Sequence, residues 1–396
     1  MFYKTLSGTL LIAGTTIGAG MLGIPLLTAR AGFLPAIGIT IAVWLFMLAT
    51  GYLYLEATLW MHQEANVLSM SRRFLGRTGK WFAGAIYLFL YYCLMIAYYA
   101  AGAPIFMAFI NQMLGTSLAG GLGYLAYGLV FGGIVLMGLK VIDRINYLLM
   151  AAMFVSYFAL VGVGSSILSF EHFGYANWSE MLFAAPILFS AFGYHNVIPS
   201  LVSYFDRNVK VVRRAIFFGT LVPLLIFIVW QGLILGAVPL SAIEEALALG
   251  QPVTQALYAL TGSPWVVQMG QFFAFFAIIT SMLGVAFSMV DFLGDGCGVR
   301  RTGLVRLVLC LATFIPPFLF ASLDPTIFVT ALGFAGGFGE VFLNGLLPIG
   351  MVWVGRYHRK LEGMPQLFGD KVFLQILFAL GVSVTILEIV FLFRNH

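Results

Sequence analysis

Apolar runs of about membrane thickness follow one another along almost the whole chain, and only short polar segments separate most of them. A transmembrane helix needs about 20 consecutive apolar residues. The longest connections are 61–80 and 239–264, and the second contains SAIEEALALGQPVTQAL, which predicts a surface helix. The pattern predicts eleven spans, at 6–29, 33–60, 81–110, 119–139, 146–169, 182–204, 213–238, 265–293, 303–322, 326–354 and 371–393. We therefore expect an all-α polytopic membrane protein with one transmembrane domain over residues 1–396.

Composition supports a chain built for lipid. Of its 396 residues 61% are hydrophobic and only 9% are charged, with a mean hydropathy of +1.01, whereas soluble domains carry about 25% charged residues. Cys93, Cys297 and Cys310 lack CxxC spacing, so we expect no disulfide framework, no metal site and no cofactor. The first run has no small-residue cleavage site, and we expect it to remain as a span.

Basic residues predict the orientation, because they accumulate in cytoplasmic loops. With the N-terminus inside, 18 of the 20 lysines and arginines fall on the inner side, and Arg30 and Arg394 fall outside. A missed span would reverse the side of every later connection, and the basic residues would then no longer gather on one side. We expect a cytoplasmic N-terminus and a periplasmic C-terminus in a bacterial inner membrane. The net charge of +5 then reflects topology, and we expect no nucleic-acid partner, since the basic residues form no continuous stripe.

The span 6–29 contains a stretch that is unsuited to a continuous helix, GTTIGAGMLGIP at 14–25. A break inside the membrane frees backbone groups that must bind something else. The span 182–204 contains a second such stretch, ILFSAFGYHNVIPSL at 187–201, and its Ile198-Pro199 aligns with Ile24-Pro25 at an offset of 174 residues. These spans run in opposite directions. Broken helices in corresponding positions of inverted halves are typical of inverted-repeat transporters, although Gly and Pro are also common in membrane helices.

These stretches, together with TSMLGVAFSMVDFLGDG at 280–296, resemble the bacterial hydroxy/aromatic amino acid permeases, and among them the tyrosine-specific members. The resemblance covers essentially the whole chain. It implies the leucine-transporter-like fold of the amino acid–polyamine–organocation superfamily, with inverted repeats at 6–169 and 182–354 and an added helix at 371–393. It also implies ion-driven uptake of an aromatic amino acid, most closely tyrosine, across the inner membrane.

The two breaks predict where an amino acid binds. Free N–H groups at the start of a half-helix attract a carboxylate, and open carbonyls accept an ammonium group or a small cation. The hydroxyls of the two threonines in the first break either contact the substrate or bond a carbonyl one turn back. The candidate binding residues in the breaks are Thr15, Thr16, Gly18, Ala19, Gly20, Phe189, Phe192, Gly193, Tyr194, His195 and Asn196.

Selectivity for a side chain is expected from the span 81–110, where tyrosines recur at helical spacing. Tyrosine rings can pack around the aromatic ring of a substrate, and a tyrosine hydroxyl can hydrogen-bond a substrate hydroxyl. Tyr91, Tyr92 and Tyr98 are the candidates, and the alternative is that these rings only pack helices together.

The coupling ion has several candidate sites. His195 either contacts the substrate or a proton, or ties down loose backbone. Thr280 and Ser281 resemble the sodium site of sodium-coupled members of the superfamily. Glu340 is a candidate proton carrier, since a buried carboxyl group can bind and release a proton, or else it is a paired structural acid. Proton symport and sodium symport therefore both remain open, with proton symport preferred.

Other classes of protein fit the sequence less well. An intramembrane enzyme would need a nucleophile–base pair or a metal cluster, and no HExxH or GxSxG motif occurs, so we expect a transporter and no enzyme. Channels also use broken half-helices but commonly assemble from several subunits. An amino-acid sensor would usually carry a soluble signalling domain.

Overall fold

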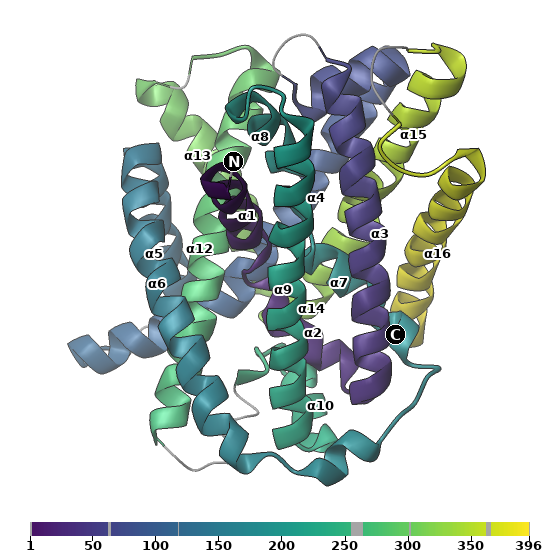
Figure 1. Ribbon diagram of the computed structural model, residues 1–396. Helices are drawn as coiled ribbons and strands as arrows, with labels where there is room; N and C mark the ends of the chain where they lie inside the picture. Colours follow the sequence, from purple (N-terminus) through teal and green to yellow (C-terminus); the bar gives the residue numbers. More distant parts are fainter. Residues whose placement is uncertain are drawn as a thin grey trace.

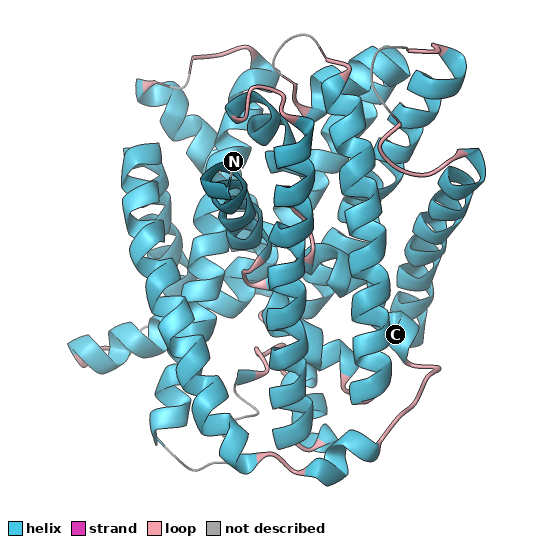
Figure 2. Cartoon of the chain, in the orientation of Figure 1, coloured by secondary structure: helices cyan, strands magenta, loops and turns pink. Residues whose placement is uncertain are grey.

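The computed structural model describes residues 2–61, 65–117, 119–254, 264–300, 302–361 and 366–395. These residues form helices and their connections, and no strand occurs among them (Figure 2). Ten of the helices are long and apolar enough to cross a membrane, and one bent pair brings the number to eleven if the pair is a single span. The prediction of an all-helical polytopic membrane protein is confirmed.

The first part of the chain forms six long or paired helices, followed by three short 3₁₀ turns. In order these are α1 (Phe2–Thr16), α2 (Gly20–Thr28), α3 (Phe33–Leu59), α4 (Val67–Leu114), α5 (Gly120–Met137), α6 (Leu139–Gly164), η1 (Ser165–Ile167), η2 (Phe170–Gly174) and η3 (Met181–Ala184).

The second part begins with two short helices and ends with a long one. In order the elements are α7 (Ala185–Ala191), η4 (His195–Val197), α8 (Ile198–Tyr204), α9 (Val209–Ala237), α10 (Leu240–Ala248), α12 (Pro264–Cys297), α13 (Gly303–Leu323), α14 (Phe328–Phe334), η5 (Ala335–Leu346), α15 (Leu347–Trp353), η6 (Val354–His358) and α16 (Lys371–Asn395).

The largest boundary difference concerns the connection predicted at 61–80, which is partly helical. Asn66 caps the start of α4: its side chain accepts from the Ser69 N–H, and the Ser69 hydroxyl accepts from the Asn66 N–H. This reciprocal pair satisfies two free donors at the helix start. Gly76 has a φ of 77° and interrupts the helical conformation, so the long apolar part of α4 follows it.

The predicted span 326–354 corresponds to the helical stretch Phe328–His358, which contains two π-helical segments, η5 and η6. Such segments often mark functional sites. The predicted surface helix is confirmed as α10, and the end of that predicted stretch, from residue 255, lies outside the described residues.

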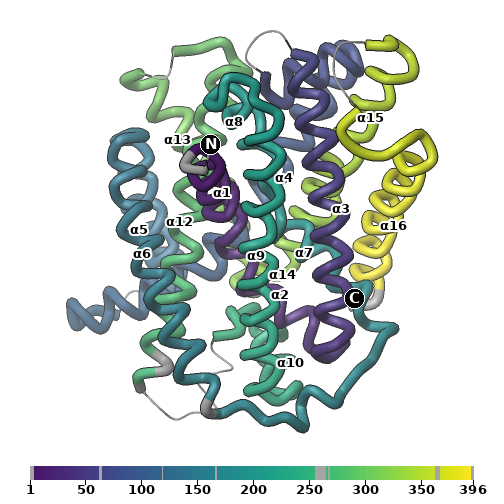
Figure 3. The backbone as a smooth tube through the Cα atoms, in the orientation of Figure 1, coloured from purple at the N-terminus to yellow at the C-terminus, as the bar shows by residue number. Residues whose placement is uncertain are grey.

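The helices stand side by side in a bundle (Figures 1 and 3). α1 packs against α9, and α12 packs against α6 and α4. In Figure 1, α5 and α6 form the left edge and α16 the right edge. The turn between α8 and α9 lies at the end of the bundle nearer the N-terminus, and α10 lies at the opposite end. The short α7 and α2 lie within the bundle and contact each other.

A buried ion pair joins two distant parts of the chain. Arg356 on η6 holds the Glu56 carboxylate of α3 through Nε and Nη2, each at 2.7 Å, and the two side chains are only 9% and 2% exposed. The Leu367 N–H donates to the same carboxylate at 2.9 Å. Arg356 also donates to the carbonyls of Phe368 and Gly369. The pair therefore holds the segment before α16 against α3.

We predict that Glu56→Gln lowers the melting temperature of the purified protein by several degrees. The Arg356 guanidinium then stays buried without its carboxylate, and breaking such a pair costs about 3–5 kcal/mol. Glu244→Gln is the matched control, because the Arg30–Glu244 pair is about 40% exposed and such pairs contribute less than about 1 kcal/mol. Equal losses in the two variants would contradict a special role for the buried pair.

Candidate functional site

The first helix interruption lies between α1 and α2, whose axes are bent by 59°. α1 ends at Thr16 and α2 begins at Gly20. The last turn of α1 is closed by the Ile17 N–H, which donates to the Ala13 carbonyl at 2.8 Å. The carbonyl of Ile17 and the N–H of Gly18 then have no hydrogen-bond partner within the described parts of the chain. This interruption therefore exposes a free acceptor and a free donor on adjacent residues.

A serine of α12 supports the first interruption. The Ala19 N–H donates to Ser281 Oγ at 3.1 Å. Gly18 lies directly against the same hydroxyl, because a methyl group on Gly18 would overlap Ser281 Oγ. Tyr98 on α4 lies within interaction distance of Ser281 as well. Ser281 thus connects α1–α2, α4 and α12.

The second interruption lies between α7 and α8. α7 ends at Ala191, and the 3₁₀ turn η4 begins at His195. The N–H groups of Gly193 and Tyr194, between them, have no hydrogen-bond partner in the described structure. The two interruptions are in direct contact, since a methyl group on Gly20 would lie only 3.0 Å from Ala191 Cα. The chain therefore brings two sets of free backbone groups to one place.

The side chains of Tyr194 and His195 point toward α3. The Tyr194 hydroxyl donates to the Met47 carbonyl at 3.1 Å, and His195 Nε2 lies 3.0 Å from Thr50 Oγ1. Thr50 donates its own proton to backbone carbonyls of α3, so its oxygen accepts from Nε2–H. His195 Nδ1 then carries the free lone pair, and it is buried without a partner. His195 thus ties the second interruption to α3, one of the two roles expected for it.

Glu340 on η5 lies against the second interruption. A methyl group on Gly193 would come within 2.5 Å of Glu340 Oε1 and 2.9 Å of Oε2. The carboxyl group accepts a hydrogen bond from the Asn344 amide one turn away, and Glu340 is only 6% exposed. It also lies close enough to Tyr91 and Tyr98 to interact with them. Glu340 therefore contacts the break and lies near both tyrosines.

Two of the three candidate tyrosines face this region. Tyr91 interacts with Asn196 of the second interruption and with Ser288 of α12. Tyr98 interacts with Ser281, which holds the first interruption. Both rings are buried. The two phenols consequently lie on the side of α4 that faces both interruptions.

The remaining candidate rings point elsewhere. Tyr92 donates its hydroxyl to the Ala312 carbonyl of α13 at 2.9 Å. Phe189 packs against a phenylalanine of α3 at a centroid distance of 5.0 Å, and Phe192 against one of α9 at 5.1 Å. The structure does not bring these three side chains to the Tyr91–Tyr98 cluster.

The threonine hydroxyls are used within their own helices. Thr15, Thr16 and Thr280 each donate to the carbonyl four residues back, at 2.8, 2.8 and 2.9 Å. This is the alternative role expected for the first two. Their oxygen lone pairs stay available as acceptors.

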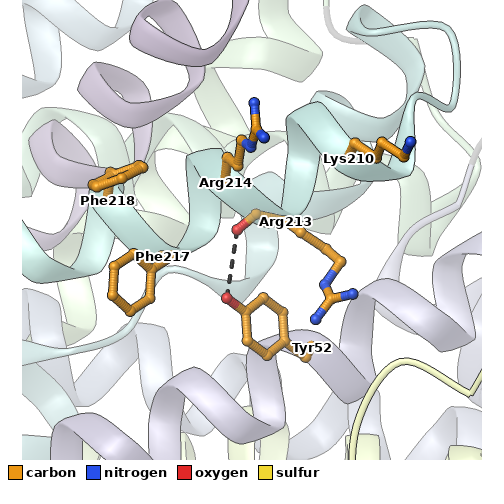
Figure 4. Close-up of a pocket in the computed structure, with 6 residues that line it drawn as sticks. All are labelled: Tyr52, Lys210, Arg213, Arg214, Phe217 and Phe218. Atoms are coloured by element: carbon orange, nitrogen blue, oxygen red, sulfur yellow. Dashed lines mark hydrogen bonds between the residues drawn. The ribbon is translucent and has the colours of Figure 1, made fainter.

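A cavity of about 410 Å³ lies elsewhere, between α3 and α9 (Figure 4). Its lining contains three basic and three aromatic side chains: Tyr52, Lys210, Arg213, Arg214, Phe217 and Phe218. The Tyr52 hydroxyl donates to the Arg213 carbonyl at 3.5 Å, and the Arg213 guanidinium lies 5.4 Å from the Tyr52 ring centroid. None of the predicted site residues lines this cavity.

Two supporting residues of the site were not predicted. Asn344 follows Glu340 by four residues, and this spacing on a helix could have indicated the pairing. Thr50 carries no such signal, because its partner His195 is 145 residues away.

Comparisons of the sequence with a family model and with individual proteins point to the same family. The sequence model of the tryptophan/tyrosine permease family matches residues 1–388. The tyrosine-specific transport system 1 of Haemophilus influenzae is 31% identical over 96% of each chain. Two tryptophan-specific transport proteins are also similar: that of H. influenzae is 32% identical over 84% of this chain and 83% of its own length, and that of Pseudomonas aeruginosa is 29% identical over 91% and 88%.

We predict that Ser281→Ala destabilises the protein. The buried Ala19 N–H loses its acceptor, which costs about 1–3 kcal/mol, and the melting temperature of the purified protein falls. Ser383→Ala is the control, since this exposed serine of α16 donates only to the Leu380 carbonyl of its own helix. If Ser281→Ala melts at the native temperature, the hydroxyl does not hold the first interruption.

Proposed function

Because the chain belongs to the tryptophan/tyrosine permease family, we propose that it imports an aromatic amino acid, tyrosine above the others, by proton symport with alternating access. It is a transport protein of the membrane and no enzyme. The observation that carries the proposal is the contact between the two helix interruptions, with Tyr91, Tyr98 and Glu340 directly beside them.

The free backbone groups fit the charged end of an amino acid. The N–H of Gly18 suits the α-carboxylate, and the carbonyl of Ile17 suits the α-ammonium group. These two charges of a zwitterion lie about 3 Å apart, close enough to bind at one interruption. Gly193 and Tyr194 supply further free donors. The backbone therefore recognises what all amino acids share.

The aromatic side chain is recognised by the phenols of α4 in this proposal. Tyr91 and Tyr98 are buried, and each has a polar neighbour in reach. A site that hydrogen-bonds a substrate hydroxyl rejects an analogue without it far more strongly than shape alone does. The tyrosine-specific relative supports tyrosine as the preferred substrate.

Glu340 is the proposed proton carrier. An ionised carboxylate buried without a cation is costly, whereas a protonated one is not. Glu340 contacts the second interruption through Gly193, so its protonation state acts directly on the groups that hold the substrate. Sodium coupling through Thr280 and Ser281 is the alternative outcome of the transport test.

We extend the proposal to architecture and topology. Residues 6–169 and 182–354 form inverted repeats of a leucine-transporter-like fold, with 371–393 as an added helix. The two interruptions at corresponding places in these halves support it. The distribution of basic residues supports a cytoplasmic N-terminus and a periplasmic C-terminus in the inner membrane. Alternating access then moves the half-helices around one central site.

Uptake into proteoliposomes tests the function. We expect labelled tyrosine to accumulate under an inward proton gradient in sodium-free buffer, and a protonophore to abolish accumulation. Unlabelled tyrosine should compete better than tryptophan, phenylalanine or leucine. Accumulation only after sodium is added would contradict proton coupling, and leak without saturation would indicate a channel.

We predict that Tyr98→Phe lowers the preference for tyrosine over phenylalanine. One lost hydrogen bond to the substrate hydroxyl corresponds to about 1 kcal/mol, or roughly fivefold in the ratio of inhibition constants. Tyr92→Phe is the matched control, because the Tyr92 hydroxyl bonds α13. Equal preferences in native protein and Tyr98→Phe would remove Tyr98 from the recognition of the substrate.

We predict that Glu340→Gln uncouples transport. Glutamine keeps the size of the side chain but binds no proton, so accumulation under a proton gradient falls by at least about tenfold, while exchange of external for internal tyrosine continues. Glu245→Gln, which changes an exposed acid on α10, should behave as the native protein does. Gradient-driven accumulation at the native level in Glu340→Gln would exclude Glu340 as the carrier.

A further inference from the structure

A second buried acid, Glu388, lies in the second half of the apolar helix α16. It is only 2% exposed, and no hydrogen bond or ion pair to it occurs within the described residues. Acidic side chains inside a membrane-spanning helix are rare and usually functional. The sequence TILEIVF around it is otherwise apolar apart from one threonine. Its position therefore calls for a role.

Two glycines make room for this acid on the neighbouring helix. A methyl group on Gly333 would lie 2.7 Å from Glu388 Oε1, and one on Gly337 would lie 2.7 Å from Glu388 Cγ. Thr385, one turn before Glu388 on α16, donates to the Gly337 carbonyl at 2.9 Å. The face of α16 that carries Glu388 is thus fixed against the 333–337 stretch.

The same stretch leads directly to the proposed proton carrier. Gly337 precedes Glu340 by three residues, which is about one helical turn. The inner carbons of the Glu388 side chain thus contact this helix about one turn before Glu340, and its carboxyl oxygens lie beside Gly333, earlier in the same stretch. The π-helix η5 covers both Gly337 and Glu340, and irregular helical segments of this kind recur at functional sites.

The elements that pack against α16 carry one acidic side chain among their described residues, Glu340, whose carboxyl group lies beside Gly193. α16 packs against η5, α15, α7 and η3, and Glu388 also touches Gly333 of α14, a helix whose described residues include no acidic or basic side chain. Among the described residues of these four elements Glu340 is the sole acidic or basic side chain. α7 adds one polar group, Ser190, whose buried hydroxyl has no partner in the described structure and whose N–H lies beside Gly336. No cation from these elements offsets an ionised Glu388.

We propose that Glu388 is a second proton-binding site of this transporter, which acts together with Glu340 on the helix between them. The inference rests on the proton symport proposed above. A buried carboxyl group without a cation is neutral when it holds a proton and costly when it loses it. Glu388 on α16 touches the 333–337 stretch, which leads into the helical segment that carries Glu340, so a change of charge at Glu388 acts on Glu340 through this shared stretch. Proton binding at Glu388 therefore changes the protonation of the acid that contacts the substrate-binding break.

Glu388→Gln in proteoliposomes tests the inference, with a trapped pH-sensitive dye reporting protons that enter with tyrosine. We expect tyrosine exchange to stay within about twofold of native, while proton entry and gradient-driven accumulation fall by at least about tenfold. Glu245→Gln should leave both unchanged. Native coupling in Glu388→Gln would overturn the inference, because glutamine preserves any hydrogen bond that a protonated acid donates and would suffice for a structural role.

Gly333→Ala is an independent variant that keeps the acid but displaces its carboxyl group. We expect the pH dependence of tyrosine uptake to shift in Gly333→Ala and to stay unchanged in Gly350→Ala, where a methyl group meets no atom within 4 Å. An unshifted profile in Gly333→Ala would contradict the proposed site. If Glu388→Gln fails to insert, Glu388→Asp replaces it, with a shifted profile expected and a native profile contradicting the inference.

The two proposals fail in different ways. Native protein that accumulates tyrosine under a proton gradient, together with a fully coupled Glu388→Gln, would remove only Glu388. If the native protein does not accumulate tyrosine under a proton gradient, proton symport is contradicted, and so is the proton-binding role of Glu388.

Discussion

Backbone hydrogen bonding constrains everything else in this molecule, because a chain in hydrocarbon must satisfy its N–H and C=O groups internally. The helices do so along most of their length. Within the described structure, backbone groups of Ile17 and Gly18 and of Gly193 and Tyr194 have no such partner, and the two interruptions touch where Gly20 meets Ala191. These two places require partners, and a zwitterionic substrate is a partner that can arrive and leave.

The rest of the site keeps the interruptions open. Ser281 binds one N–H of the first, and Thr50 and Met47 bind side chains of the second. Ser281 lies on α12, and Thr50 and Met47 both lie on α3, so each interruption is held by a different helix. Two acidic side chains are buried in the same region. Glu340 faces the second interruption, and Glu388 of α16 faces the 333–337 stretch that precedes Glu340.

Some of this arrangement could be predicted from the sequence. Glycine, proline and threonine clusters disfavour a regular helix, and they identified both interrupted stretches. An acid in an apolar run is costly, and this cost indicates Glu340 in the span 326–354 and, by the same reasoning, Glu388 in the span 371–393. The direction of side chains could not be predicted in the same way. The 81–110 part of α4 has no charged side chain on any face, so its periodicity does not distinguish Tyr98, which faces the interruptions, from Tyr92, which bonds α13.

Other features depend on contacts between distant residues. The tie between His195 and α3 requires Thr50, and nothing near His195 in the sequence indicates it. The π-helical segments arise within an ordinary apolar run. The capping box at Asn66 is a local sequence signal for a helix start. It lies in a segment that the apolar pattern predicts only as a connection.

Hydrogen–deuterium exchange with and without tyrosine tests the central claim most directly, that the two interruptions together hold the amino acid. The account predicts that tyrosine slows exchange in peptides covering residues 14–25 and 187–201, and that leucine at the same concentration does so much less. Protection confined to other segments, such as the Tyr52–Phe218 cavity, or no protection in a protein that transports tyrosine, would contradict it.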